Sequence, residues 1–132
     1  MTDMKELAGK ISDSELEVME LLWSSGQALS ITDIRLALQE RTNWEATTIK
    51  TLVSRLVTKG AISQERHKVF YYSPRISREE YRSAMTGELI DKLYRGSSRS
   101  LVASLVRSKS LSQSDMDELR ELFNSGYEEG DS

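Results

Sequence analysis

The chain has 132 residues, no cysteine, one histidine and a net charge of −3 at pH 7. This length allows one domain or two very small ones, and the lack of cysteine excludes disulfides and zinc–thiolate sites. No apolar run approaches the roughly 18 residues of a membrane span, and the polar N-terminus lacks the apolar core of a signal peptide. We therefore expect a cytoplasmic protein that is not bound to a membrane.

Four serines, each followed three residues later by an acid, predict the starts of helices. In such a capping box the serine side chain accepts a hydrogen bond from a free backbone N–H, and the acid side chain accepts one from the backbone N–H of the serine. The pairs are Ser12 and Glu15, Ser30 and Asp33, Ser77 and Glu80, and Ser112 and Asp115, with a weaker pair at Thr42 and Glu45. Apolar periodicity then predicts helices over about 13–24, 31–39, 44–59 and 77–94, a short apolar one through 101–106, and a last one through 116–123.

Two β-prone runs follow the third helix directly. Residues 61–66 and 69–73 flank the polar pair His67-Lys68, and Pro74 closes the segment. This pattern predicts a β-hairpin, although the turn lacks the favoured glycine-containing pair. Three helices followed by a hairpin predict a mostly α-helical fold that begins with a winged helix-turn-helix over residues 1–75. In that fold the third helix enters the DNA major groove and the hairpin reaches along the backbone or minor groove.

The third helix has one apolar face and one face without acids. Ile49, Leu52, Val53, Leu56 and Val57 recur at helical spacing,. The opposite face carries hydroxyls flanked by cations and no carboxylate, whereas a solvated helix face normally mixes both signs. The acid-free face therefore indicates contact with phosphates and base edges.

The net charge hides an uneven distribution. Residues 44–75 hold six Lys or Arg against two Asp or Glu, a net +4, whereas residues 1–43 sum to −4 and residues 76–132 to −3. The basic segment coincides with the third helix and the hairpin, and this asymmetry indicates where a polyanion would bind.

The residues expected to contact DNA form two groups. Those near the start of the third helix should meet base edges or the groove: Ala46, Thr47, Thr48, Lys50 and Thr51. Those expected to meet phosphates are Ser30, Thr32, Ser54, Arg55, Arg66, His67, Lys68 and Tyr71. Ser30 is a helix cap with or without DNA. Tyr71 and Tyr72 alternate faces, so only one of them should be free to touch phosphate.

The three helices predicted over residues 76–126 are too few to close a core easily, because so short a segment buries little surface. A second copy of the chain would cover their apolar stripes most simply. We therefore expect a homodimer formed through Leu89, Leu93, Leu101, Val102, Leu105, Val106, Leu119, Leu122 and Phe123. Residues 127–132 are read as an acidic, disordered tail.

Catalysis finds little support in the sequence. There is no glycine-rich phosphate loop, no nucleophile elbow and no histidine–carboxylate arrangement, so no enzyme activity and no cofactor are expected. A single histidine without cysteines is a poor metal ligand, and no metal site is predicted. Two alternatives stay open: a winged-helix module that binds protein instead of DNA, and a metal-responsive repressor that uses carboxylates and His67.

Five segments together resemble the penicillinase-repressor family of bacterial regulators (BlaI/MecI/CopY type). They are residues 11–23, 44–60, 71–74, 76–81 and 111–120, and the Thr-Ile-Lys-Thr-Leu…Arg-Leu…Lys-Gly core within residues 48–60 is quite specific. The resemblance implies a dimeric repressor with an N-terminal winged helix, a C-terminal helical dimerisation domain and a palindromic operator. It also implies that the helix matching residues 47–58 reads the major groove.

The chain departs from two input mechanisms of that family. Its β-lactam-responsive members are cleaved at an Asn-Phe bond, and alignment puts Ser104-Leu105 at that position. Its copper-responsive members end in a Cys-x-Cys motif, and this chain has no cysteine. The resemblance therefore identifies neither the inducing signal nor a regulatory protease or small effector, and it leaves the target genes and the half-site spacing open.

Overall fold

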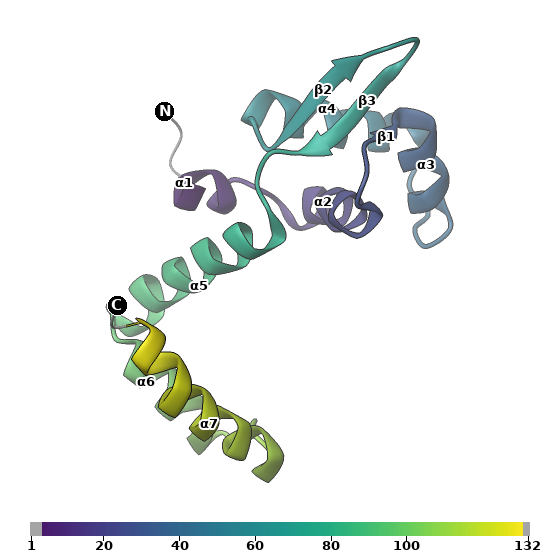
Figure 1. Ribbon diagram of the computed structural model, residues 1–132. Helices are drawn as coiled ribbons and strands as arrows, with labels where there is room; N and C mark the ends of the chain where they lie inside the picture. The colour runs from purple at the N-terminus through teal and green to yellow at the C-terminus, as the bar shows by residue number, and fades with distance from the viewer. Residues whose placement is uncertain (1–3, 131–132) are drawn as a thin grey trace. The chain divides into compact units, whose positions relative to one another are not determined.

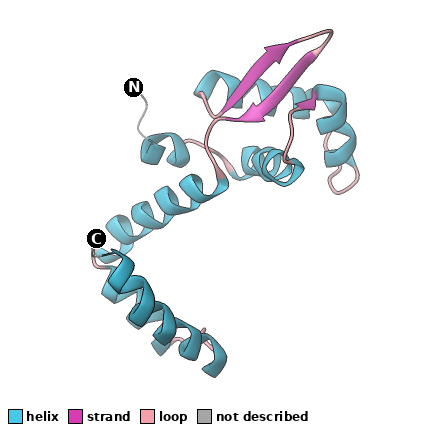
Figure 2. Cartoon of the chain, in the orientation of Figure 1, coloured by secondary structure: helices cyan, strands magenta, loops and turns pink. Residues whose placement is uncertain are grey.

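The computed structural model describes residues 4–130, with side-chain surroundings up to residue 126. Its elements are α1 (Met4–Gly9), α2 (Asp13–Ser25), β1 (Leu29–Ser30), α3 (Ile31–Gln39), α4 (Ala46–Lys59), β2 (Ile62–Arg66), β3 (Phe70–Pro74), α5 (Arg78–Tyr94), α6 (Ser98–Arg107) and α7 (Gln113–Gly130) (Figure 1). The backbone divides into two compact units, Met1–Glu88 and Leu89–Ser132. All three strands lie in the first unit (Figure 2).

The first unit is the predicted winged helix. Helices α2, α3 and α4 pack against one another and against the sheet. The core contains their buried apolar residues together with Leu7, Ile11, Ala61, Ile62, Tyr72 and Ile76. The sheet has a third strand that sequence periodicity did not reveal, because β1 is only two residues long. It pairs antiparallel with β3, so the strand order is β1-β3-β2. The mostly α-helical winged fold is confirmed.

All four predicted capping boxes are present. At Ser12 and Ser30 the serine oxygen accepts from the N–H of the acid three residues on, and the acid accepts from the serine N–H. The same reciprocal bonds form at Ser77 and at Ser112. Each box satisfies two donors that a helix start otherwise leaves free.

The weaker box at Thr42 does not form. The Thr42 hydroxyl instead donates to the carbonyl of Leu38 (2.8 Å) and accepts from the N–H of Trp44 (3.3 Å). Helix α4 consequently begins at Ala46, two residues later than predicted, and its N-cap Glu45 makes no side-chain cap bond. The end of α4 is as expected: Gly60 adopts a φ of 84°, which glycine reaches without strain, and its N–H closes the last turn,.

The hairpin turn is longer than predicted. Arg66 pairs with Phe70, so residues 67–69 form the loop and Val69 belongs to the turn and not to a strand. The physical reason lies in the backbone. Two-residue hairpin turns need positive φ angles, and no residue from 67 to 69 has one.

Helix α1 was not predicted, because its six residues show too little periodicity. It nevertheless buries Leu7 and Ala8. Just after it, the carbonyl of Lys10 accepts a hydrogen bond of 2.7 Å from the Lys59 ammonium at the end of α4. The same ammonium forms an ion pair of 2.5 Å with Glu15, whose side chain is 2% exposed. The last turn of α4 is thereby tied to the start of α2.

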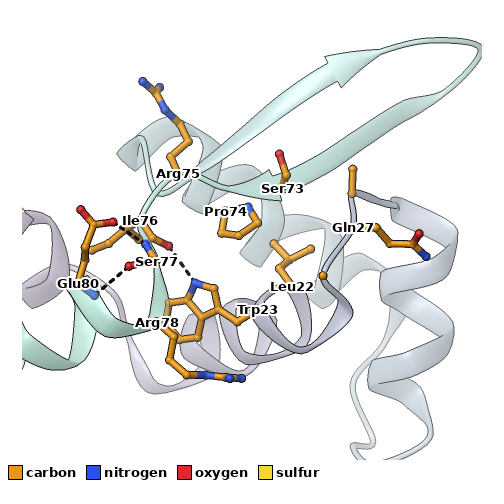
Figure 3. A pocket seen from close by; sticks show the side chains of 12 residues that line it. Leu22, Trp23, Gln27, Ser73, Pro74, Arg75, Ile76, Ser77, Arg78 and Glu80 are labelled. Carbon is orange, nitrogen blue, oxygen red and sulfur yellow. Dashed lines mark hydrogen bonds between the residues drawn. The ribbon is translucent and has the colours of Figure 1, made fainter.

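The start of α5 belongs to the first unit. The indole N–H of Trp23 donates to the carbonyl of Ile76 (2.9 Å; Figure 3). The guanidinium of Arg78 donates to Glu20 and Ser24. Trp23, Ile76 and Arg78 border a hollow of about 500 Å³ beside the capping box at Ser77. The division at residues 88 and 89 therefore falls inside α5, beyond the boundary at residues 75 and 76 that the sequence indicated.

The second unit contains the end of α5, and α6 and α7. Among the side chains described from residue 77 to residue 126, none is buried. Phe123 of α7 borders a shallow hollow with Val102 and Ala103 of α6. Helix α7 continues to Gly130, so residues 127–130, expected in a disordered tail, extend the helix. Residues 131–132 of that tail lie outside the described residues.

The buried carboxylate of Glu15 makes the fold sensitive to acid. Burial raises the pKa of Glu15, but the hydrogen bonds from Lys59 and Ser12 and the charge of Lys59 outweigh that effect, so this pKa lies below its ordinary value of 4.5. A carboxyl group with a depressed pKa stabilises the folded state above its unfolded pKa. That stabilisation is lost as the pH falls through the folded pKa.

Replacing Glu15 by Gln should lower the free energy of unfolding by about 2 kcal/mol at pH 7. The variant leaves Lys59 unpaired, and the cost is below that of a fully buried pair because Lys59 stays partly exposed. Glu6→Gln is the matched control, since its pair with Lys10 is exposed, and it should cost less than about 0.5 kcal/mol. Urea unfolding at fixed protein concentration measures both. A Glu15→Gln deficit that stays constant down to pH 3 would contradict this account.

Candidate nucleic-acid interface

Helix α4 presents the predicted acid-free face. Ile49, Leu52, Val53 and Leu56 are buried, and this burial fixes the rotation of the helix about its axis. The side chains turned outward are Thr47, Thr48, Lys50, Thr51, Ser54, Arg55 and Thr58, all exposed, with Ala46 half-buried at the first turn. This face offers donors and positive charge and no carboxylate, which suits a phosphate backbone and base edges.

The loop before α4 is held by its own hydrogen bonds. The Gln39 side-chain amide donates to the carbonyl of Trp44 (3.2 Å), beside the bonds of Thr42. The α4 N-terminus therefore has a defined position although no side chain caps it. One turn further on, the Thr51 hydroxyl donates to the Thr47 carbonyl (2.9 Å) and keeps its lone pairs for a donor such as a base amino group,.

The hairpin has two chemically different faces. On the face toward α4, Gln64 donates to the Tyr72 hydroxyl (3.0 Å), and the Arg66 guanidinium lies 5.5 Å from the centre of the Phe70 ring. On the other face Glu65, the only acid of the hairpin, stands opposite Tyr71. The alternation of side chains along a strand thus puts the acid on the face turned away from α4.

The predicted phosphate contacts do not all lie together. Arg66, His67 and Lys68 are exposed at the hairpin end. Tyr71 is half-buried on the face that carries Glu65, with its ring 5.7 Å from that of His67. Tyr72 is the tyrosine that packs into the core, at 7% exposure.

The two contacts predicted at the start of α3 differ in exposure. Thr32 is exposed, whereas Ser30 is 9% exposed and its oxygen is engaged as the α3 cap. The capping role of Ser30 is therefore the one with structural support.

Sequence reasoning missed two apolar residues of the hairpin. Val69 is 52% exposed and Phe70 is 40% exposed, directly beside the cations of the turn. Their high β-propensity predicts a strand and says nothing of their exposure. The alternation of side chains along the strand could have identified Phe70. It puts Phe70 on the same face as Tyr72, which is the face toward α4.

A groove of about 470 Å³ separates α4 from the hairpin. Its α4 side carries Lys50, Ser54 and Thr58, and its hairpin side carries Val69 and Phe70. No carboxylate borders it. The groove therefore lies between the outer face of α4 and the hairpin. We call the outer face of α4, the groove and the exposed cations Arg66 and Lys68 together the α4–hairpin surface, and none of these parts contains a carboxylate.

Known proteins are similar to this chain in sequence and in fold. A family model described as penicillinase repressor matches residues 11–125. The methicillin resistance regulatory protein MecI of Staphylococcus aureus (strain N315) is 34% identical over 116 residues, 87% of this chain and 94% of that protein. The penicillinase repressor of Bacillus licheniformis is 29% identical over 86% of this chain and 89% of its own length. The solution structure of the DNA-binding domain of the repressor BlaI matches with a TM-score of 0.52 and 32% identity, covering 61% of this chain and 94% of that one.

The fold and the α4–hairpin surface define a winged-helix DNA-binding protein. The chain belongs to the penicillinase-repressor family, and it is a transcriptional repressor. Within the described residues, no helix is long and apolar enough to cross a membrane. In the same part of the chain, no three His, Cys, Asp or Glu side chains lie close enough to hold a metal ion together.

Proposed function

We propose that the chain acts in the cytoplasm as a homodimer on an inverted-repeat operator, and that it works by occupying DNA and not by catalysis. Each copy lays the start of α4 in the major groove and the hairpin end along the adjacent backbone. Operator occupancy then blocks polymerase. The observation that carries this proposal is the acid-free α4–hairpin surface within an otherwise acidic chain.

The exposed residues of α4 and the hairpin have different proposed contacts, depending on their position. Residues 46–51, at the helix start, lie where a recognition helix meets base edges, and Thr47 and Thr51 offer the hydroxyls that discriminate among them. Arg55, together with Arg66 and Lys68 of the hairpin, supplies charge to phosphates and so sets affinity and register. All five of these side chains are exposed in the structure.

A second copy is needed for specificity. One helix reads only a few base pairs, at about 1–3 kcal/mol each, which cannot select one site in a genome. Two tethered half-sites multiply their discrimination, because the second contact is made at high effective concentration.

The second unit supports the dimer. It buries no described side chain of its own, yet it exposes large apolar residues on each of its helices. Those exposed are Leu89, Leu93, Val102, Leu105, Val106, Leu122 and Phe123, and Leu101 and Leu119 are half-buried beside them. Apolar area of this extent is stabilised by removal from water, and a second copy offers the same stripes in a self-complementary arrangement.

The DNA proposal is tested by selecting duplexes from random-sequence DNA with the wild-type chain and measuring affinity for the selected duplex against salt. Each phosphate contact adds about 0.9 to the slope of log affinity against log salt. Arg55→Ala with Lys68→Ala should therefore flatten that slope by about 2 and weaken binding. Arg120→Ala removes one charge from α7, where the side chain is 71% exposed, and should change neither quantity.

Two results would count against the DNA proposal. One is a chain that enriches no duplex, which would favour the alternative of a protein-interaction module. The other is a slope that stays the same without Arg55 and Lys68.

The dimer proposal predicts the effect of charges on α7. Leu122→Glu with Phe123→Glu should give a monomer in sedimentation velocity, because both side chains are more than 60% exposed in the single chain and would carry like charges into the interface. Affinity for the selected duplex should fall about a hundredfold or more as avidity is lost.

Leu36→Glu provides the matched control for the dimer. Leu36 is a large apolar residue of α3 with 55% exposure, so the substitution makes the same chemical change outside the second unit. This variant should stay dimeric. A Leu122→Glu, Phe123→Glu chain that also stays dimeric would overturn the assignment of the interface.

A further inference from the structure

The groove between α4 and the hairpin has two chemically distinct walls. The α4 wall is lined by Lys50, Ser54 and Thr58, which carry an ammonium group and two hydroxyls. The opposite wall is lined by the side chains of Val69 and Phe70. Apolar residues lie between the walls, among them Val53, which is 2% exposed. The groove thus pairs a cationic, hydrogen-bonding side with an apolar side along its length.

The apolar wall of the groove is exposed to solvent. Gln64 and Tyr72 close the inner end of the hairpin face with a hydrogen bond, and Tyr72 is buried. Phe70 continues the same face outward but is left 40% exposed, with the Arg66 guanidinium over its ring. This cation–π contact orients the ring and holds a positive charge beside it.

We propose that this groove holds one strand of the DNA backbone, with a phosphate against Lys50, Ser54 and Thr58 and the neighbouring deoxyribose against Val69 and Phe70. The inference rests on the proposed function and specifies how the hairpin engages DNA. It assigns contact residues, Val69 and Phe70, that carry no charge and that a search for cations overlooks.

The position of the groove argues for a backbone strand. The phosphodiester backbone is what separates the major from the minor groove. If α4 lies in one groove and the hairpin end reaches toward the next, a backbone strand has to pass between them. The space between them is this groove.

The chemistry of the two walls argues the same. A nucleotide backbone alternates an anionic phosphate with a largely apolar sugar ring, and the groove offers a partner for each. The absence of any carboxylate along it fits an anionic strand better than a mixed-charge protein segment. The exposed Glu65, on the other face of the hairpin, is kept away from the phosphates.

Phe70→Ala tests the sugar contact on the selected duplex. Removing the ring should weaken binding about tenfold, because the apolar area covered by the sugar is lost. The slope of log affinity against log salt should stay unchanged, because an uncharged contact releases no counterion. Phe70→Leu should recover most of the affinity. Lys50→Ala should instead flatten the slope by about 1.

Hydroxyl-radical cleavage reads the sugars directly. The wild-type chain should protect one short run of deoxyriboses in each half-site, and Phe70→Ala should restore cleavage there while protection elsewhere persists. Leu36→Ala is the control for an exposed apolar side chain outside the groove, and it should change neither affinity nor protection. Thermal unfolding checks that each variant is folded, and Val69→Ser is the second variant if Phe70→Ala is not.

Three results would overturn the inference. The first is wild-type affinity in folded Phe70→Ala and Val69→Ser chains. The second is a Phe70→Ala defect that flattens the salt slope, which would mean that the ring acts only through Arg66. The third is a change in oligomeric state, which would mean that a second copy of the chain covers the groove. A wild-type chain that selects no DNA counts instead against the proposed function, so the two failures are distinguishable.

Discussion

The burial of the apolar stripe of α4 is the interaction on which the rest of the structure depends. Ile49 and Leu56 are completely buried against α2, α3 and the sheet. That contact fixes the rotation of α4, and rotation alone decides which side chains reach solvent. The ion pair between Lys59 and Glu15 then limits how the last turn can move. Because the buried stripe runs the length of α4, the exposed residues opposite it also form one continuous face. The residues without acids therefore lie together on one surface of the folded protein.

In the hairpin, the alternation of side chains along each strand decides which residues face α4. Its inner residues complete the core and its outer residues prolong the same face into solvent, so one strand serves both stability and binding. The single acid, Glu65, falls on the opposite face because it is one residue out of phase with Gln64 and Arg66. A shift of one residue in register would exchange these faces and bring a carboxylate toward α4. The register of β2 and β3 is therefore as important to the charge of the surface as the number of cations is.

Much of this arrangement was predictable from the sequence, and the exceptions have physical causes. Capping boxes and strong helical periodicity located most of the helices, because both signals are local. Helix α1 and strand β1 were missed because they are short and depend on tertiary contacts. The Thr42 box failed because a competing acceptor, the Leu38 carbonyl, lies within reach. For the candidate interface, charge identified the cations, whereas the exposure of Phe70 depends on where the hairpin turns and could not be read from propensity.

The unburied second unit has a consequence for how the protein responds to its own abundance. Under the proposed dimerisation, helices α6 and α7 gain their packing only when two chains meet, so the folded population of this unit rises with chain concentration. The species that binds an operator then scales with the square of the free monomer concentration. A modest fall in the number of chains per cell would empty the operator disproportionately. Loss of repression would not require every chain to be inactivated. Dilution or partial degradation would lower the concentration of the dimer more than that of the chain.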